Sequence, residues 1–274
     1  MDKQFWLDIR ENNFALPTGQ SVGPLTEELL SYLESTDPDL RDLIAYETFS
    51  NWLEQGLYSS NELRAYILRL ILNLQNGIGE RDTDTVFTRT FSALFLAEIV
   101  NYDNRHPFLD KDEVLNILAK GLNYLEEEMD PRGYVPVKGW AHALAHTADL
   151  LYVLASNRHL ARENLEQILK QIAVKLTAPT DWVYIHGEDD RLVRAVIAAY
   201  QRHLASEDWL TTITPDGNNT WRDSFMDLFL QNAFFNSKTF LRSLYLHILQ
   251  TEELANKDHI LESVQKSLQA LRQF

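Results

Sequence analysis

The sequence predicts an all-α fold, an α-α superhelix of HEAT-like stacked antiparallel helix pairs. Apolar residues recur at helical spacing along almost the whole chain, with little of the alternation expected in strands. Only 10 glycines and 8 prolines interrupt the 274 residues, so long helices are favoured. Comparable helices recur every 47 to 53 residues, the length of a helix pair, as indicated by Asp42, Arg89, His142, Arg191 and Arg242.

Local signals define the ends of the expected elements. Pro24 suits the first turn of a helix, Ser59 suits an N-cap, and Gly56 is placed to end a helix. The apolar run 66–72 predicts burial on more than one side of its helix, and residues 214–219 form the clearest exposed turn. The expected helices span residues 2–11, 25–34, 40–55, 62–74, 84–102, 110–127, 139–151, 162–176, 191–200, 221–230, 237–249 and 259–271.

A chain of this length can bury a large core without disulfides or a structural metal. We therefore expect a single all-helical domain over residues 1–274. The terminal helices of a stacked array cover its open ends, so residues 1–36 and 220–274 are the expected caps.

Composition excludes several classes of protein. The chain has no cysteine, so disulfides and thiolate chemistry are absent and a reducing compartment is favoured. A net charge of −15 repels nucleic acids at long range, so nucleic acid is not expected as a partner. The amino terminus lacks the apolar run of a secretory signal, and no segment approaches about 18 consecutive apolar residues. We expect a cytoplasmic protein that has no contact with membranes.

The predicted helix at 139–151 carries polar residues on one stripe. A connector at 129–136, rich in turn residues, leads into it. At about 100° per residue, His142, His146 and Asp149 fall on one side of the helix and its apolar residues on the other. This pattern is typical of a helix that packs with one face and presents two imidazoles and a carboxylate with the other.

Two interpretations of this stripe stay open. Two histidines four residues apart can bind one metal ion, with Asp149 as third ligand or as the acceptor that orients an imidazole. His186 or Glu188 could add a ligand, and such a site would suit zinc or iron. Alternatively, both histidines form hydrogen bonds to neighbouring helices, in which case no cofactor is present.

Arginines are the second group of candidates. Arg89 lies on an almost entirely apolar helix and therefore needs acceptors. Together with Arg191 it could bind an anionic ligand, or the two could pair with carboxylates such as Asp149 and Glu188. Trp140 could form one wall of a pocket. The residues expected to line a polar concave groove are Arg89, Trp140, His142, His146, Asp149, His186, Glu188 and Arg191.

Several short runs together resemble the bacterial family known as domain of unknown function 2785 (DUF2785). They lie at residues 42–52, 86–92, 130–134, 139–149, 187–192 and 240–245, and the tryptophan-histidine run at 139–149 is the most specific. Pro131 separates an aspartate and an arginine that the resemblance would place side by side. The resemblance covers residues 42–249 and implies an all-helical fold with no established activity.

These observations predict a cytoplasmic helical-repeat protein that binds or scaffolds a peptide, a partner protein or a small polar ligand in its groove. No sequence motif indicates catalytic residues. The alternative is a metal-dependent enzyme of the hydrolase type that uses His142 and His146. The aromatic carboxy-terminal helices, around Phe235 and Phe240, could also mediate self-association.

Overall fold

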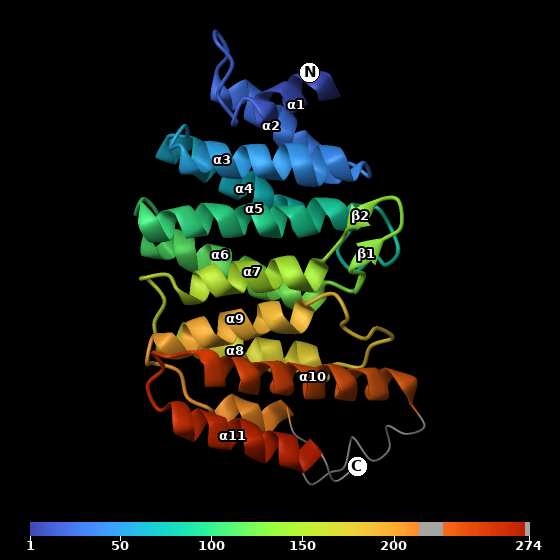
Figure 1. The fold of residues 1–274 in the computed structure, drawn as a ribbon, viewed down its shortest axis with the longest axis vertical. Coiled ribbons are helices and arrows are strands. Elements are labelled where there is room, and N and C mark those ends of the chain that lie inside the picture. Colours follow the sequence, from blue (N-terminus) through green and yellow to red (C-terminus); the bar gives the residue numbers. More distant parts are fainter. Residues whose placement is uncertain (214–226, 272–274) are drawn as a thin grey trace. The chain divides into compact units, whose positions relative to one another are not determined.

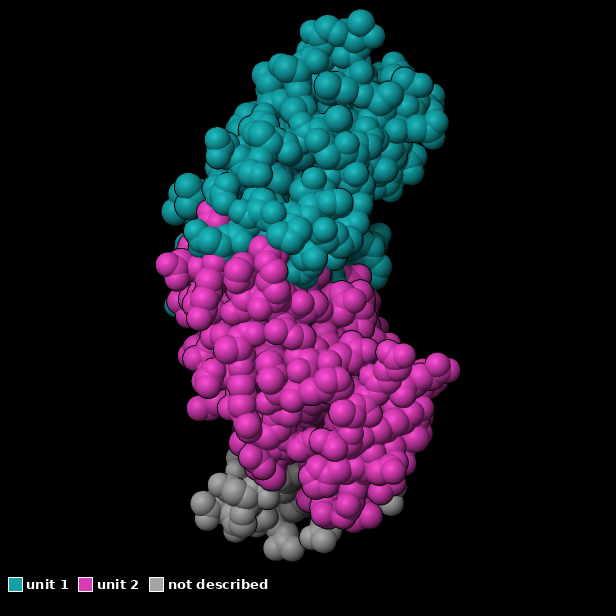
Figure 2. Space-filling view, turned by 90° about the vertical axis from the view of Figure 1, so that its left-hand side faces the viewer, with its two compact units in different colours: residues 1–110, 127–150 teal, residues 111–126, 151–274 magenta. Residues whose placement is uncertain are grey.

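The computed structural model describes residues 1–213 and 227–271, and this part of the chain is all-α with one small two-stranded sheet. It divides into two compact units (Figure 2). Unit 1 comprises Met1–Asp110 and Glu127–Leu150, and unit 2 comprises Lys111–Glu126 and Leu151–Phe274. The predicted all-α class is confirmed.

Unit 1 contains short helices followed by two long ones. Its elements are α1 (Lys3–Glu11), α2 (Val22–Ser31), η1 (Tyr32–Glu34), η2 (Asp39–Tyr46), α3 (Glu47–Glu54), α4 (Ser60–Asn73), α5 (Thr85–Arg105), β1 (Tyr134–Val135), β2 (Gly139–Trp140) and the first part of α7 (Ala143–Ala155). Helix α5 packs against α3 and α4 (Figure 1). Because it is covered on several sides, α5 is buried along most of its length.

The helix starts of unit 1 follow local capping chemistry. Asp2 accepts a hydrogen bond from the backbone nitrogen of Phe5 and caps α1. Ser59 and Glu62 form a reciprocal capping box at the start of α4. The expected start at Pro24 is late, since α2 begins two residues earlier at Val22.

The prediction that the apolar run 66–72 is buried on more than one side is wrong. Tyr66, Ile67, Leu70 and Ile71 are buried, whereas the Leu68 and Leu72 side chains are 63% and 74% exposed. Helix α4 therefore packs with one face only, because the side chains of the other face meet no neighbouring helix in unit 1.

The segment expected to open the histidine helix is also different. Gly139 and Trp140 form β2, which pairs antiparallel with β1 in the connector. Helix α7 begins only at Ala143. His142 precedes it with a left-handed φ of 52°, and its carbonyl accepts the first helical hydrogen bond, from the nitrogen of His146. Gly139, at φ +79°, turns the chain in a way that a helix does not allow.

Unit 2 consists of the remaining helices. They are α6 (Lys111–Glu127) apart from its last residue, the second part of α7, α8 (Arg162–Thr177), α9 (Glu188–Gln201), η3 (Asp208–Ile213), α10 (Leu228–Gln250) and α11 (Lys257–Ala270). Helix α10 packs against α8, α9 and α11 (Figure 1). The expected helix 237–249 lies within α10. The expected turn at 214–219 and most of the expected helix 221–230 lie outside the described residues.

No helix in the described ranges combines the length and apolarity needed to cross a membrane.

Candidate functional site

The β1–β2 hairpin of unit 1 lies directly on the π-helix η2. A Cβ atom added at Gly139 would stand 2.8 Å from the Cβ of Pro38 and 3.1 Å from Nη2 of Arg41, so only glycine fits. The same Nη2 donates a hydrogen bond of 2.8 Å to the carbonyl of Lys138. π-Helices are rare and are frequent at functional sites, which draws attention to the residues that this one carries.

Arg41 holds the hairpin, η2 and α5 together. Its side chain is fully buried, and its guanidinium carbon lies 4.1 Å from the ring centre of Phe87 and 4.7 Å from that of Phe91. It donates hydrogen bonds to the carbonyl of Ser35 and to Oδ2 of Asp42, both at 2.8 Å. Burial lowers the pKa of Arg41, and pairing with Asp42 opposes this effect.

Asp42, the next residue, is half-buried at the edge of this arrangement. Burial raises its pKa to about 6, although the adjacent Arg41 favours its ionised form. The effect of desolvation on the pKa of Asp42 is therefore larger than that of the ion pair with Arg41. The hairpin thus lies beside a carboxyl group that is partly protonated at about pH 6.

Aromatic rings lead from the exposed hairpin into the core of unit 1. The ring centres of Tyr134 and Trp140 are 4.9 Å apart. The ring of Trp140 stacks on His142 at 4.2 Å with an interplanar angle of 25°. His142 in turn meets His146 edge to face at 5.6 Å, and His146 meets Phe91 edge to face at 5.0 Å. Both histidines are buried, whereas Trp140 is 38% exposed.

A second carboxylate lies half-buried on α5. Glu98 accepts a hydrogen bond of 2.7 Å from the Tyr46 hydroxyl and another from Ser50. Burial raises the pKa of Glu98, the two hydrogen bonds oppose this, and the negative charges of Glu54 and Asp149 raise it further. Across residues 1–213 and 227–271, no lysine or arginine lies within ion-pair distance of Glu98. A carboxylate in this setting can bind a cationic or hydrogen-bonding group, or act as a general acid or base.

Arg89, a predicted groove residue, is instead fully buried in the structure of unit 1. Its Nε and Nη2 atoms donate to the two carboxylate oxygens of Glu128 at 2.6 and 3.0 Å. Its Nη1 atom donates to the carbonyls of Asn76 and Gly77 and to the Thr85 hydroxyl. The expectation that Arg89 needs acceptors is met, but by a bidentate pair that joins α5 to the segment after α6.

Of the other predicted groove residues, Asp149 lies in unit 1, whereas Arg191, His186 and Glu188 lie in unit 2. Glu188, the first residue of α9, is buried and accepts a hydrogen bond of 2.7 Å from the backbone nitrogen of His186. The nitrogen of Arg191 donates to the carbonyl of Gly187, the N-cap residue, which adopts φ +82°. His186 and Glu188 therefore organise the start of α9, an anionic group at a helix N-terminus being favourable.

Within the described ranges, His142 and His146 are not joined by enough further ligands to form a metal site. No group of three or more His, Asp or Glu side chains there has an arrangement that could hold a metal ion. The edge-to-face contact of His142 with His146 is an aromatic packing geometry. The two predicted ligands are adjacent, as the sequence indicated, but the described neighbourhood does not complete a site.

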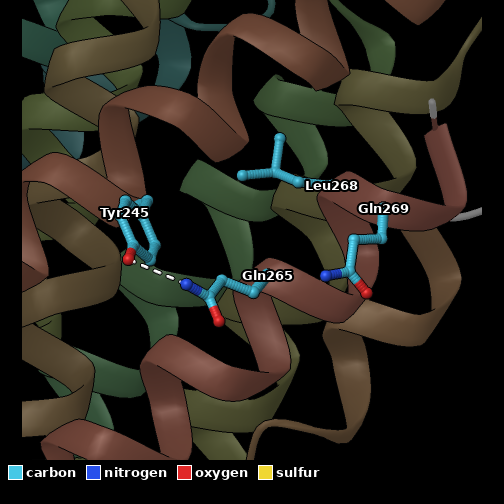
Figure 3. A pocket seen from close by; sticks show the side chains of 4 residues that line it. All are labelled: Tyr245, Gln265, Leu268 and Gln269. Carbon is cyan, nitrogen blue, oxygen red and sulfur yellow. Dashed lines mark hydrogen bonds between the residues drawn. The ribbon is translucent and has the colours of Figure 1, made fainter.

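Two of the surface cavities formed by the described residues of unit 2 lie near its carboxy-terminal helices. One, of about 380 Å³, is lined by Tyr245 of α10 and by Gln265, Leu268 and Gln269 of α11. Figure 3 shows Tyr245 and Gln265 turned toward each other, and the amide of Gln265 donates a hydrogen bond of 2.9 Å to the Tyr245 hydroxyl. The other, of about 330 Å³, lies between η3 and α11 and includes Glu207.

Sequence reasoning missed several residues of the unit 1 cluster: Arg41, Asp42, Tyr46 and Glu98. The spacing of Asp42 and Tyr46, four residues apart, and of Phe91 and Glu98, seven apart, was available as a helical stripe signal. Pairs at these spacings are common on the surfaces of ordinary helices. Neither pair therefore indicates a binding site when its helix is considered alone.

The fold and the site together define an all-α protein in which a π-helix, a buried helix and a short hairpin bring carboxylates and aromatic rings together. The sequence profile of the family described as "Protein of unknown function (DUF2785)" matches residues 74–246, more than half of the chain. The chain belongs to this family. The matched range includes Trp140, His142 and Glu98, whereas Arg41 and Asp42 precede it. Searches of curated proteins and of solved structures found no match.

Proposed function

We propose that this chain is a binding or scaffolding protein that holds a peptide, a partner protein or a small polar ligand against the β1–β2 hairpin of unit 1. The contact surface consists of Trp140 and the half-buried Asp42 beside the hairpin. Further along the unit it includes the half-buried Glu98, which accepts from the Tyr46 hydroxyl, and Asp149, whose charge acts on Glu98. Binding at this surface needs no catalytic group.

One observation carries the proposal. The Trp140 ring is 38% exposed, yet it is stacked on the buried His142 and flanked by Tyr134. A ring held in this way has lost its rotamer freedom before any ligand arrives, so stacking a planar or apolar group on it costs little additional entropy. Fixed, half-exposed aromatic rings are enriched at binding surfaces for this reason.

Two carboxylates supply polar recognition, Asp42 beside the hairpin and Glu98 next to Tyr46. Asp42 and Glu98 both have raised pKa values because burial disfavours their ionised forms. A ligand that brings a hydrogen-bond donor or a positive charge relieves this cost, so it binds more tightly here than at a solvated carboxylate. Within residues 1–213 and 227–271, no lysine or arginine lies close enough to Glu98 to compete with a cationic ligand for its carboxylate.

A cytoplasmic location and a HEAT-like repetition of helix pairs belong to the same proposal. The absence of cysteine fits a reducing compartment. Helix pairs recurring every 47 to 53 residues fit repeat proteins that bind partners along an extended surface.

Thermal shift measurements with a panel of amino acids, short peptides and sugars test the proposal, followed by calorimetric titration of every compound that raises the melting temperature. Trp140→Ala should weaken binding about tenfold or more while the circular dichroism spectrum is unchanged. Phe229→Ala, which removes a 47% exposed aromatic ring from unit 2, should leave the affinity unchanged. Equal affinities for wild type and Trp140→Ala would refute the assignment of this surface.

A metal-dependent hydrolase is the second candidate, favoured only by the adjacency of the two buried histidines His142 and His146. Elemental analysis of protein purified without a metal-affinity tag decides it. Stoichiometric zinc or iron that is lost in His142→Ala and retained in the surface control His203→Ala would replace the binding proposal. Absence of both metals from correctly folded protein would remove this candidate.

A further inference from the structure

Helix α10 of unit 2 presents an apolar seam that no described part of unit 2 covers. Leu228, Phe235, Leu246 and Leu249 are between 46% and 63% exposed. At helical spacing these four side chains fall on one side of α10, opposite the residues through which it packs into the unit. Large half-exposed apolar residues in a row mark an interaction surface, whereas single ones are ordinary.

The spacing of the seam fits a second helix. Leu228, Phe235, Arg242 and Leu249 follow one another at intervals of seven residues, the repeat of helices that pack along their length. The helix has 23 residues and is therefore about 34 Å long, enough for several turns of continuous contact. On one flank the hydrogen bond between Tyr245 and Gln265 joins α10 to α11 (Figure 3).

The charge along the helix is unusual for this chain. Although the protein has 40 acidic residues, α10 has none, and Lys238 and Arg242 lie among its exposed or half-buried residues. No hydrogen bond or ion pair to Arg242 exists within residues 1–213 and 227–271. A partner that covers the seam also removes Arg242 from water, so a partner with a group that attracts a cation at that point is favoured.

A second copy of the helix meets that requirement. Leu228, Phe235, Arg242 and Leu249 are arranged symmetrically about the midpoint between Lys238 and Thr239, so that an antiparallel copy places Leu228 against Leu249 and Phe235 against Arg242, while Leu246 faces Gln231. The guanidinium of each copy then lies over the phenylalanine ring of the other, a favourable cation–π contact formed twice. A parallel copy would instead place Arg242 against Arg242, which is repulsive. An isologous two-fold interface requires such self-complementarity.

We infer that α10 is a self-association surface through which two copies of this chain pair antiparallel, with the two-fold axis between Lys238 and Thr239. Only about four apolar side chains per copy are buried, so the dimer is weak and forms in a concentration-dependent manner.

Analytical ultracentrifugation over roughly a hundredfold range of concentration tests the inference. Wild type should pass from monomer to dimer. Leu246→Glu should raise the dimer dissociation constant by about tenfold or more. The matched control Leu72→Glu, at a more exposed leucine of α4 in unit 1, should behave as wild type. Circular dichroism confirms that each variant is folded. A wild-type monomer at every concentration, or equal dissociation constants for all three proteins, would overturn the inference.

Disulfide cross-linking tests the antiparallel arrangement, because the chain has no cysteine of its own. Thr239→Cys, next to the two-fold axis, should cross-link to itself on oxidation. A mixture of Leu228→Cys and Leu249→Cys should cross-link, whereas Leu249→Cys alone should not, since its copies would lie about 31 Å apart. Faster cross-linking of Leu249→Cys alone than of the mixture would contradict the two-fold arrangement. A monomer that instead binds an acidic amphipathic peptide through α10 would also contradict it.

Discussion

Gly139→Ala tests the close contact between the hairpin and η2. The backbone at Gly139 has φ +79°, which costs a residue with a side chain about 1–2 kcal/mol. The new Cβ would also lie 2.8 Å from the Cβ of Pro38, an atom fixed in a ring, and 3.1 Å from Nη2 of the buried Arg41. Overpacking of this kind lowers the free energy of unfolding by about 1–3 kcal/mol more. We expect a total loss of about 2–5 kcal/mol in the free energy of unfolding.

Gly79→Ala is the matched control. Gly79 has φ +82° in the same unit, and an added Cβ there meets nothing within 4 Å. This variant should lose only the backbone part, about 1–2 kcal/mol. Urea denaturation followed by circular dichroism gives both values. If the two variants are equally destabilised, the hairpin does not pack on Pro38 and Arg41 as described, and the site built on that contact is wrong.

Three further predictions concern the ion pairs and the caps of unit 1. Arg89→Met should cost about 3–5 kcal/mol of unfolding free energy, because it leaves the carboxylate of Glu128 buried without its partner. Asp42→Asn should become more stable relative to wild type as the pH rises from about 4 to about 6. In that window the folded chain still holds the proton of Asp42, whose pKa is raised to about 6, and the unfolded chain, with a value of about 3.9, has released it. Ser59→Ala should cost about 1 kcal/mol, since it removes the capping box with Glu62.

Each of these has a direct check by denaturant unfolding. Arg105→Met removes an exposed pair with Glu54 and should cost less than about 1 kcal/mol; a similar loss in Arg89→Met would show that burial of the Arg89 pair is unimportant. A stability difference between Asp42→Asn and wild type that does not change with pH would contradict the raised pKa. The capping contribution is in doubt if Ser59→Ala unfolds at the wild-type denaturant concentration.

The helices were predictable because their signals are local. The apolar periodicity of residues 85–105, the capping box at Ser59 and Glu62, and the N-cap at Asp2 each involve residues within a few positions of one another. Even the requirement that Arg89 find acceptors follows from its apolar surroundings in the sequence. Its partner, Glu128, lies 39 residues away, and many other carboxylates were equally eligible.

The candidate site was predicted only in part. His142, His146 and Trp140 were identified, but as residues of one helix, whereas Trp140 lies in a strand and His142 precedes α7. The reason is the left-handed turn at Gly139, where the chain packs too closely on Pro38 and Arg41 for any side chain. Such a contact between distant segments leaves no periodic pattern in the sequence.

By itself the sequence determined the all-α class, the positions of most helices and the membership suggested by its tryptophan-histidine run, since all of these depend on short-range patterns. Only the tertiary structure decided which polar side chains became half-buried neighbours. The raised pKa of Glu98 and of Asp42 results from desolvation by elements remote in the chain. The exposed seam of α10 likewise depends on which of its faces the rest of unit 2 leaves uncovered. Burial is a property of packing, and packing is not encoded in any one segment.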